Sequence, residues 1–223
     1  MNNKLIIFGA GKISEVVSFY INSERLYDIC AYVIEDEFID KKSFLGKPII
    51  GLSEVLEKFP ANIYKCLVAV GYQKNNKFRR DKFDFFKHNG YNFASYISKK
   101  INSEFKFGEN VIIMDDAIIQ PHVSIGNNVF IWGGAMVGHH SKVEDNCWIT
   151  GGSMIGGSST IGNSTFLGMG SVVGHEIIIK KNCFVGASAL ITKNLNENSV
   201  VISSDSTTHR LSTDQFLKIS KML

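Results

Sequence analysis

The sequence predicts a Rossmann-like α/β domain followed by a left-handed parallel β-helix of hexapeptide repeats. Before residue 100, short apolar runs alternate with segments whose apolar residues have helical spacing. After residue 100, an aliphatic or aromatic residue recurs at every sixth position. The glycines shift as well, with 6 of 20 in residues 1–100 and 14 in residues 101–190. We therefore expect domains at 1–98 and 99–200, and a tail with a short helix at 201–223.

The first half alternates strand-like and helix-like segments. Residues 5–8 are an apolar run that ends at Gly9, as a buried parallel strand would, and helix-spaced apolar residues follow from Val16. Further strands are expected at residues 30–34, 67–70 and 93–97, and further helices at 53–59 and 76–88. This alternation predicts a small parallel sheet that is covered by helices.

The second half has a period of six. From Ile101 to Ile191, sixteen successive sixth positions are aliphatic or aromatic, and eight of them are followed by glycine. Three such hexapeptides form one coil of a triangular prism, with the aliphatic residue inside and the glycine easing the corner. Coils stack about 4.8 Å apart, so residues 18 apart share a column. We expect the coil to be left-handed, against the usual crossover rule.

Composition and charge exclude several classes of protein. The net charge of +3 and the lack of a basic run argue against nucleic-acid binding. The first apolar run is too short for a signal peptide, and no stretch approaches the roughly 18 apolar residues of a membrane span. The four cysteines are far apart without a CxxC pair, and Cys147 and Cys183 fit as small core residues about 10 Å apart. We expect a cytoplasmic protein without a membrane partner.

The end of the chain carries a helix-start signal. Ser212 and Gln215 have the spacing of a capping box and precede the apolar residues Phe216, Ile219 and Leu223. A short helix here could close the open end of the prism.

The histidines are the main candidates for chemistry. His122 and His140 are 18 residues apart, and His139 and His175 are 36 apart with Gly157 between them in one column. All four lie two or three places after an aliphatic position, which places them at a corner outside the core. Unrelated surface histidines are the simplest alternative, but two aligned columns favour a site.

These features occur together with two others in the first half. A Gly-Ala-Gly loop at 9–11 follows the first strand, the acidic pair Glu35 and Asp36 follows the second, and Val-Gly-His-His stands at 137–140. In this combination, residues 4 to about 195 resemble the sugar acyltransferases typified by bacterial UDP-4-amino-sugar N-acetyltransferases and sialic-acid O-acetyltransferases. The resemblance implies an acyl-CoA-dependent N-acetyltransferase of a nucleotide-linked amino sugar in bacterial surface-glycan (lipopolysaccharide) biosynthesis. A sugar O-acetyltransferase is the close alternative.

The resemblance also implies a homotrimer without a metal, in which acetyl-CoA or another acyl-CoA lies between subunits. His139 falls at the family's catalytic base, a role that suits an imidazole. His140 beside it stands where relatives carry a carboxylate. Gly157 falls at the backbone donor for the oxyanion. The positions that line the acetyl-CoA site match Trp148, Met169 and Ala187.

For the nucleotide sugar, the resemblance implies contacts in the first domain. The matching residues are Gly11, Lys12 and Ile13 in the loop, Glu35 and Asp36 toward the base, and Gly71 at a strand end. The loop is alternatively a dinucleotide site or only a tight turn, because Ser14 replaces the third glycine of GxGxxG. The acidic pair is alternatively a solvated turn, and the three acyl-CoA positions are alternatively packing at the trimer interface.

Two functions of other classes stay open at this point. A zinc hydratase of the γ-carbonic-anhydrase type also has a trimeric β-helix, and His139 and His175 meet the spacing of its first two ligands. Its third ligand position here is Lys180. The other candidate is a non-catalytic subunit that binds a sugar nucleotide.

Overall fold

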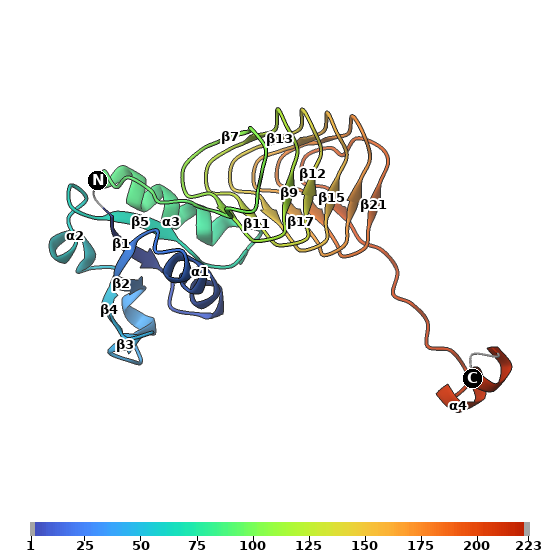
Figure 1. Ribbon diagram of the computed structural model, residues 1–223, viewed down its shortest axis with the longest axis horizontal. Coiled ribbons are helices and arrows are strands. Elements are labelled where there is room, and N and C mark those ends of the chain that lie inside the picture. Colours follow the sequence, from blue (N-terminus) through green and yellow to red (C-terminus); the bar gives the residue numbers. More distant parts are fainter. Residues whose placement is uncertain (1–2, 221–223) are drawn as a thin grey trace.

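The computed structural model describes residues 3–220. An α/β domain comes first, a triangular prism of short strands follows it, and an extended tail leads to helix α4 (Thr213–Ser220) away from the prism (Figure 1). The predicted fold class is confirmed.

The α/β domain is built on a five-stranded sheet with the order β3-β4-β2-β1-β5. Its parallel strands are β1 (Lys4–Phe8), β2 (Asp28–Ile34), β4 (Lys47–Gly51) and β5 (Lys65–Val68). The edge strand β3 (Ser43–Phe44) is antiparallel to β4. The sheet is therefore mixed rather than wholly parallel, and the β3–β4 hairpin is absent from the predicted elements.

Helices cover both faces of this sheet. One face of β1 packs against Val17 of α1 (Lys12–Ser23), and the other packs against Phe86 of α3 (Lys77–His88). Burial on both faces explains the continuous apolar run of β1. The helix expected at 53–59 is only the single turn α2 (Val55–Lys58). Within residues 3–220, no helix is long and apolar enough to cross a membrane.

The prism follows the period of six. Its two-residue strands end at consecutive sixth positions from Phe107 to Ile191, but Ile101 ends no strand. The first sheet contains β6 (Tyr96–Ile97), β8 (Ile112–Ile113), β11 (Phe130–Ile131), β14 (Trp148–Ile149), β17 (Phe166–Leu167), β20 (Phe184–Val185) and β22 (Val200–Val201). The second contains β9 (Ile118–Ile119), β12 (Met136–Val137), β15 (Met154–Ile155), β18 (Val172–Val173) and β21 (Leu190–Ile191). The third contains β7 (Lys106–Phe107), β10 (Ser124–Ile125), β13 (Lys142–Val143), β16 (Thr160–Ile161) and β19 (Ile178–Ile179).

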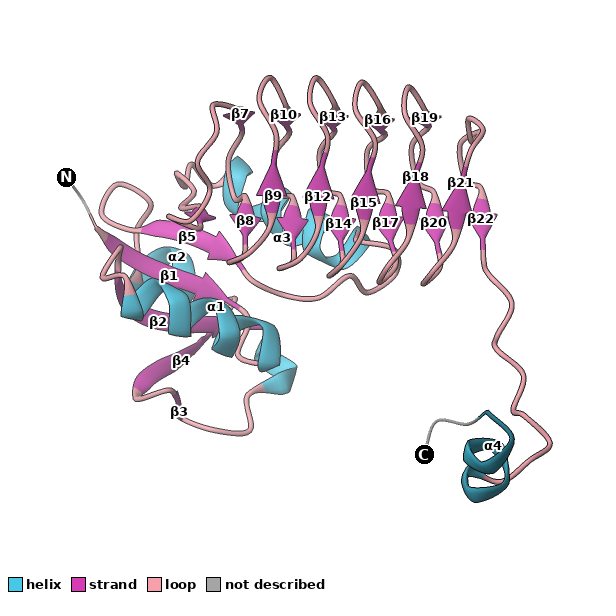
Figure 2. Cartoon of the chain, turned by 45° about the vertical axis from the view of Figure 1, so that its right-hand side comes forward, coloured by secondary structure: helices cyan, strands magenta, loops and turns pink. Residues whose placement is uncertain are grey.

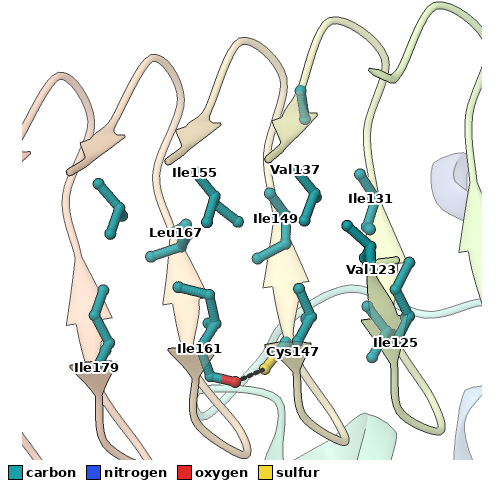
Figure 3. Packing of buried hydrophobic residues seen from close by; sticks show 14 of the residues in the cluster. Val123, Ile125, Ile131, Val137, Cys147, Ile149, Ile155, Ile161, Leu167 and Ile179 are labelled. Atoms are coloured by element: carbon teal, nitrogen blue, oxygen red, sulfur yellow. Dashed lines mark hydrogen bonds between the residues drawn. The ribbon is translucent and has the colours of Figure 1, made fainter. Parts of the chain in front are cut away.

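Residues 18 apart pair in parallel register, as the period predicts. Ile131 pairs with Ile149, which pairs with Leu167 on the next coil. Their side chains fill the prism interior in stacked layers (Figure 3). Cys147 lies in this core, is free, and approaches the carbonyl oxygen of Gly162 at 3.2 Å. Burial raises the pKa of the Cys147 thiol to about 12, so it stays protonated.

Three corners connect the sheets and are named here by their residues. The glycine corner, from the first to the second sheet, contains 115–116, 133–134, 151–152, 169–170 and 187–188. The histidine corner, from the second to the third sheet, contains 121–122, 139–140, 157–158 and 175–176. The asparagine corner, from the third back to the first, contains 109–110, 127–128, 145–146, 163–164 and 181–182.

The corner turns correct one sequence prediction. The left-handed residue is the third after each strand, from Asn110 through Ser188, and these positions carry mostly Asn, Asp, His, Ser or Gly. The glycines directly after the strands are not left-handed. Instead, a Cβ at Gly168 would lie 2.5 Å from the backbone nitrogen of Ala187 on the next coil. Close coil stacking, rather than a corner conformation, therefore requires glycine at most of these positions, with Gly174 and Gly186 as the exceptions.

The two domains are joined by a shared segment. Phe93 forms a bridge with Cys66 beside β5, whereas β6 pairs with β8 in the first sheet of the prism. The expectation that 93–97 belongs only to the α/β sheet is therefore wrong. The segment leaves one sheet and enters the other, which anchors the first domain to the prism.

The C-terminal helix forms as predicted but in another place. The Ser212 Oγ accepts the backbone N–H of Gln215 at 3.4 Å, and the Gln215 Oε1 accepts that of Ser212 at 3.1 Å, which is a capping box. Figures 1 and 2 show α4 apart from the prism, so the expectation that it closes the open end is wrong. Leu223 lies outside the described residues.

Candidate active site

The histidine corner brings two imidazoles into contact. His139 and His140 follow β12, both side chains are exposed, and only His140 has a left-handed backbone, with φ of 59°. Their Nδ1 atoms are 3.2 Å apart. The backbone N–H of His139 donates to the Gln120 Oε1 at 2.8 Å. Gln120 thus holds the backbone of His139, whose φ is not left-handed.

The two predicted histidine columns are present. The ring centroids of His122 and His140 are 4.7 Å apart, and those of His139 and His175 are 6.2 Å apart. The His175 Nε2 also lies 3.4 Å from the Glu176 carboxylate. Four rings from three coils therefore form one cluster at the prism surface.

Gly157 lies directly against the His139 ring. A Cβ at Gly157 would be 2.7 Å from the His139 Cε1, so a side chain there would displace the imidazole. The Gly157 carbonyl accepts the backbone N–H of Glu176. Among the described residues, none accepts the Gly157 N–H. The arrangement offers a free backbone donor beside an exposed imidazole, the two groups that acyl transfer uses.

A separate cavity of about 560 Å³ lies where α1 meets the prism. It is lined by Ile13, Val16 and Tyr20 of the first domain, by Tyr72, and by residues of the first sheet and the glycine corner, among them Trp132, Trp148 and Met169. Apolar side chains dominate this lining. The cavity brings together the predicted residues Ile13, Trp148 and Met169, which are far apart in sequence.

Trp148 forms the wall of this cavity rather than an open surface. It is 1% exposed and stacks on Phe130 with ring centroids 4.4 Å apart. Tyr72 packs against it at 5.5 Å. Met169, in contrast, is 67% exposed on the glycine corner, and Ala187 lies one coil farther along that corner. An open strip therefore leads along the corner to the cavity.

The buried side chain of Arg79 packs against the Trp148 ring. This residue of α3 is 1% exposed, and its guanidinium carbon lies 5.3 Å from the Trp148 ring centroid. The guanidinium donates to the backbone carbonyls of Asn128, Asn146 and Cys147 at the asparagine corner. Burial lowers the pKa of Arg79 to about 9, so it keeps its charge at pH 7. It fixes the first domain against the prism.

The glycine loop begins α1. The Ser14 hydroxyl donates to the Gly11 carbonyl at 2.8 Å and accepts the Gly11 N–H at 3.0 Å. A Cβ at Gly9 would lie 2.7 Å from the Ala69 carbonyl oxygen, so that position needs glycine for packing. Lys12 and Ile13 are the first residues of the helix, where backbone N–H groups are free to meet a ligand.

Both carboxylates of the acidic pair, Glu35 and Asp36, form polar contacts with other side chains of the first domain. Glu35 forms an ion pair with Lys82. Asp36, which starts the 3₁₀ turn Asp36–Phe38, accepts the Ser53 hydroxyl at 2.6 Å. The Ser53 hydroxyl holds the pKa of the Asp36 carboxyl below its usual value. Gly71 lies three residues after the end of β5, where the nearest neighbour of a Cβ would be the Gln73 amide, at 3.4 Å.

The sequence predictions omit three residues of this region: Tyr72, Arg79 and Trp132. The sequence does carry a signal for the aromatic face next to these residues. Aromatic residues repeat there at 18-residue spacing and form a column on the first sheet, namely Phe130, Trp148, Phe166 and Phe184. Arg79 gives no such signal, because most of its acceptors are backbone carbonyls of the prism. Within the described chain, no group of three His, Cys, Asp or Glu residues could hold a metal ion.

Comparison with known proteins assigns the two domains separately. Residues 4–86 match the family model of the PglD N-terminal domain, and residues 100–205 match that of the GMPPB C-terminal domain. The first of these matches includes the glycine loop and the acidic pair, and it confirms the resemblance inferred from the sequence motifs. No curated protein matches the chain.

Solved structures match the first domain and the prism together. The acetyltransferase domain of PglB from Neisseria gonorrhoeae is 23% identical, with a TM-score of 0.81 over 93% of this chain and 100% of that one. PerB from Caulobacter crescentus, solved with CoA and GDP-perosamine, is 24% identical, with a TM-score of 0.80 over 90% and 94%. WeeI from Acinetobacter baumannii is 18% identical, with a TM-score of 0.78 over 89% and 96%. At these identities the likeness establishes the fold.

Proposed function

We propose that this chain is an acyl-CoA-dependent N-acetyltransferase that acts on a nucleotide-linked amino sugar in bacterial surface-glycan biosynthesis, in the cytoplasm. The observation that carries the proposal is the His139 imidazole over Gly157, whose N–H has no acceptor among the described residues. This pair stands on a hexapeptide prism joined to a domain that matches the PglD N-terminal domain model. The PglB domain has been solved with acetyl coenzyme A, and PerB with CoA and GDP-perosamine.

The chemistry follows from these two groups. The sugar amine attacks the thioester carbonyl while the His139 Nε2 takes a proton from the amine. The carbonyl oxygen gains negative charge, and the Gly157 N–H donates to it. Collapse of this oxyanion breaks the carbon–sulfur bond, leaves the amide, and releases a thiolate that takes the proton. His140, which touches the His139 Nδ1, is the third member of this site.

The two substrates are assigned to the remaining residues. The acyl-CoA arm would run along the glycine corner past Ala187 and Met169 to the cavity wall at Trp148, since that strip is open and apolar. The nucleotide sugar would bind the loop at Gly11, Lys12 and Ile13. Glu35 and Asp36 would bind its base, and Gly71 would let it approach β5. The carboxylates of Glu35 and Asp36 have free lone pairs beyond their contacts with Lys82 and Ser53.

The complete site requires residues from a second copy of the chain. The histidine corner and the apolar cavity lie at opposite edges of the second sheet, so one chain does not bring them together. Outward residues of that sheet are all apolar, namely Ile118, Met136, Met154, Val172 and Leu190, and four of the five are exposed. A homotrimer that covers this sheet would place the histidine corner of one subunit near the cavity of its neighbour.

A substrate screen tests the function. Purified protein is mixed with UDP-, dTDP- and GDP-linked amino sugars and with acetyl-CoA or longer acyl-CoAs, and the free thiol is measured. We expect thiol release with one amino-sugar nucleotide, and an N-acylated product by mass spectrometry. Release with hydroxyl-only sugars would instead indicate O-acetyl transfer. No release with any pair, together with tight binding of a sugar nucleotide, would indicate a binding subunit.

A further inference from the structure

His140 and His122 occupy the position of each turn that has a left-handed backbone. Their φ angles are 59° and 65°. Short polar residues or glycine fill most of the corresponding positions in the prism. At the asparagine corner most of these side chains are buried, and they include an amide ladder in which the Asn128 amide donates to the Asn146 Oδ1. His122 and His140 instead lie exposed at the histidine corner, where their rings contact each other and the His140 ring also contacts that of His139.

The contact between the two Nδ1 atoms restricts where the protons are. A neutral imidazole carries one N–H, so one of the two rings donates and the other accepts across the 3.2 Å contact. A base at His139 needs its lone pair on Nε2, which puts the proton of His139 on Nδ1. The Nδ1 of His140 is then the acceptor, and its own proton is on Nε2.

We propose that His140 is a positioning residue that holds His139 in the tautomer with a free Nε2, and that His122 holds the His140 ring in place. This inference rests on the proposed function. In it, the neutral His140 imidazole accepts the His139 Nδ1–H and thereby orients the His139 ring. Contact with the tilted His122 ring, at 4.7 Å between centroids, limits the rotation of His140 about its side-chain bonds. A rotated ring would lose the contact with His139.

The same contact accommodates the proton during the reaction. When the amine gives its proton to the His139 Nε2, the His139 Nδ1–H remains bonded to the neutral His140 Nδ1. The positive charge is therefore spread over two hydrogen-bonded rings. When the carbon–sulfur bond breaks, the thiolate takes the proton from His139 Nε2, and both rings return to their starting tautomers. No other reactant is needed.

The backbone conformation dictates which variants test this proposal. At a left-handed residue, alanine adds strain whereas glycine adds none and asparagine is tolerated. His140→Gly removes the acceptor, and His140→Asn replaces it with an amide oxygen. We expect His140→Gly to lower kcat about 10-fold with little change in either KM, and His140→Asn to recover most of the loss. His122→Gly should give a smaller loss of the same kind.

Asn182→Gly is the matched control. Asn182 is also left-handed, with φ of 58°, and exposed, but it lies at the asparagine corner. Its replacement changes a turn residue away from the histidines and from both proposed substrate sites, and we expect kcat to stay unchanged. An equal loss in Asn182→Gly would overturn the proposal, because the effect would then come from the turn.

The tautomer itself is measured by ¹⁵N NMR of histidine-labelled full-length protein at a pH where the rings are neutral. We expect the His139 signals of an Nδ1–H tautomer, and a mixture of tautomers in His140→Gly. An Nε2–H tautomer in the unmodified protein, unchanged kcat in His140→Gly, or no recovery in His140→Asn would each overturn the proposal. The spectra need no substrate, so a failure of the proposed transferase activity is detected separately by the thiol screen.

Discussion

His139 and His140 are neighbours in the chain but occupy different backbone conformations, and this separates their roles. His139 has an ordinary backbone, and its ring reaches over Gly157 on the next coil. His140 is left-handed, and its ring turns toward His122 on the preceding coil. Only the ring of His139 lies against Gly157, whose N–H has no acceptor among the described residues, so it is the better candidate for the base.

We expect His139→Ala to lower kcat by about 10²–10⁴ with substrate binding nearly intact, because the general base acts only in the transition state. His140→Gly, which avoids strain at this left-handed residue, should cost less. Steady-state kinetics with both substrates varied, on samples with matched circular dichroism, measure the difference. If His140→Gly proves the more damaging in kcat, the base assignment is wrong and the two roles must be exchanged.

The burial of Trp148 determines which substitution at this position is informative. An alanine there would empty a fully buried site and destabilise the fold by about 3–5 kcal/mol. Trp148→Phe keeps an aromatic ring on Phe130 and beside Arg79. We expect it to raise the KM for acyl-CoA more than the KM for the sugar nucleotide. Equal effects on both, measured by initial rates, would place Trp148 outside the acyl-CoA site.

Among the secondary-structure elements, the strands of the hexapeptide repeat are the ones that the sequence predicts most directly. The aliphatic series predicts each strand from β7 to β21, because an inward side chain is required once per face, but it misses β6 and β22 at the two ends of the first sheet. The helix at α4 is equally local, since Ser212 and Gln215 alone form its cap. The β3–β4 hairpin is harder to predict because its strands are short and partly exposed, although Gly46 marks its turn with φ of 75°.

The glycines after the strands give a prediction for element stability. A Cβ at Gly162 would lie 2.6 Å from backbone atoms of Lys180 and Lys181, so Gly162→Ala should destabilise by about 1–3 kcal/mol through overpacking. Gly174 has the same place in its hexapeptide, but its nearest neighbour would be 3.4 Å away. Gly174→Ala is therefore the control, with little expected change. Thermal unfolding compares the two, and equal losses would contradict close stacking as the cause.

For the whole molecule, the outward faces of the three sheets differ. The aromatic face of the first sheet is covered by the α/β domain, whereas the outward residues of the third sheet are mostly polar, such as Lys142 and Thr160. The second sheet exposes Leu190 at 65% and Met154 at 46%. An apolar face of this kind is typical of a contact between subunits.

We expect a trimer of about 75 kDa, three times the 24.8 kDa chain, by light scattering at micromolar concentration. Leu190→Glu should dissociate it, because a charge would be buried in the interface. Ile178→Glu is the control, since Ile178 is also exposed, at 48%, but lies on the third sheet. A monomer in the unmodified protein, or equal dissociation by both variants, would contradict the assembly.

The sequence by itself determined the repeat, the columns and the alternation of the first domain, because each depends on spacing along the chain. Histidines 18 and 36 apart had to share a corner once coils of 18 residues were accepted. Only the tertiary structure decided that Arg79 binds carbonyls of the prism, that residues 93–97 divide between two sheets, and that α4 stands apart. These depend on how separately formed surfaces meet, and no local period encodes such contacts.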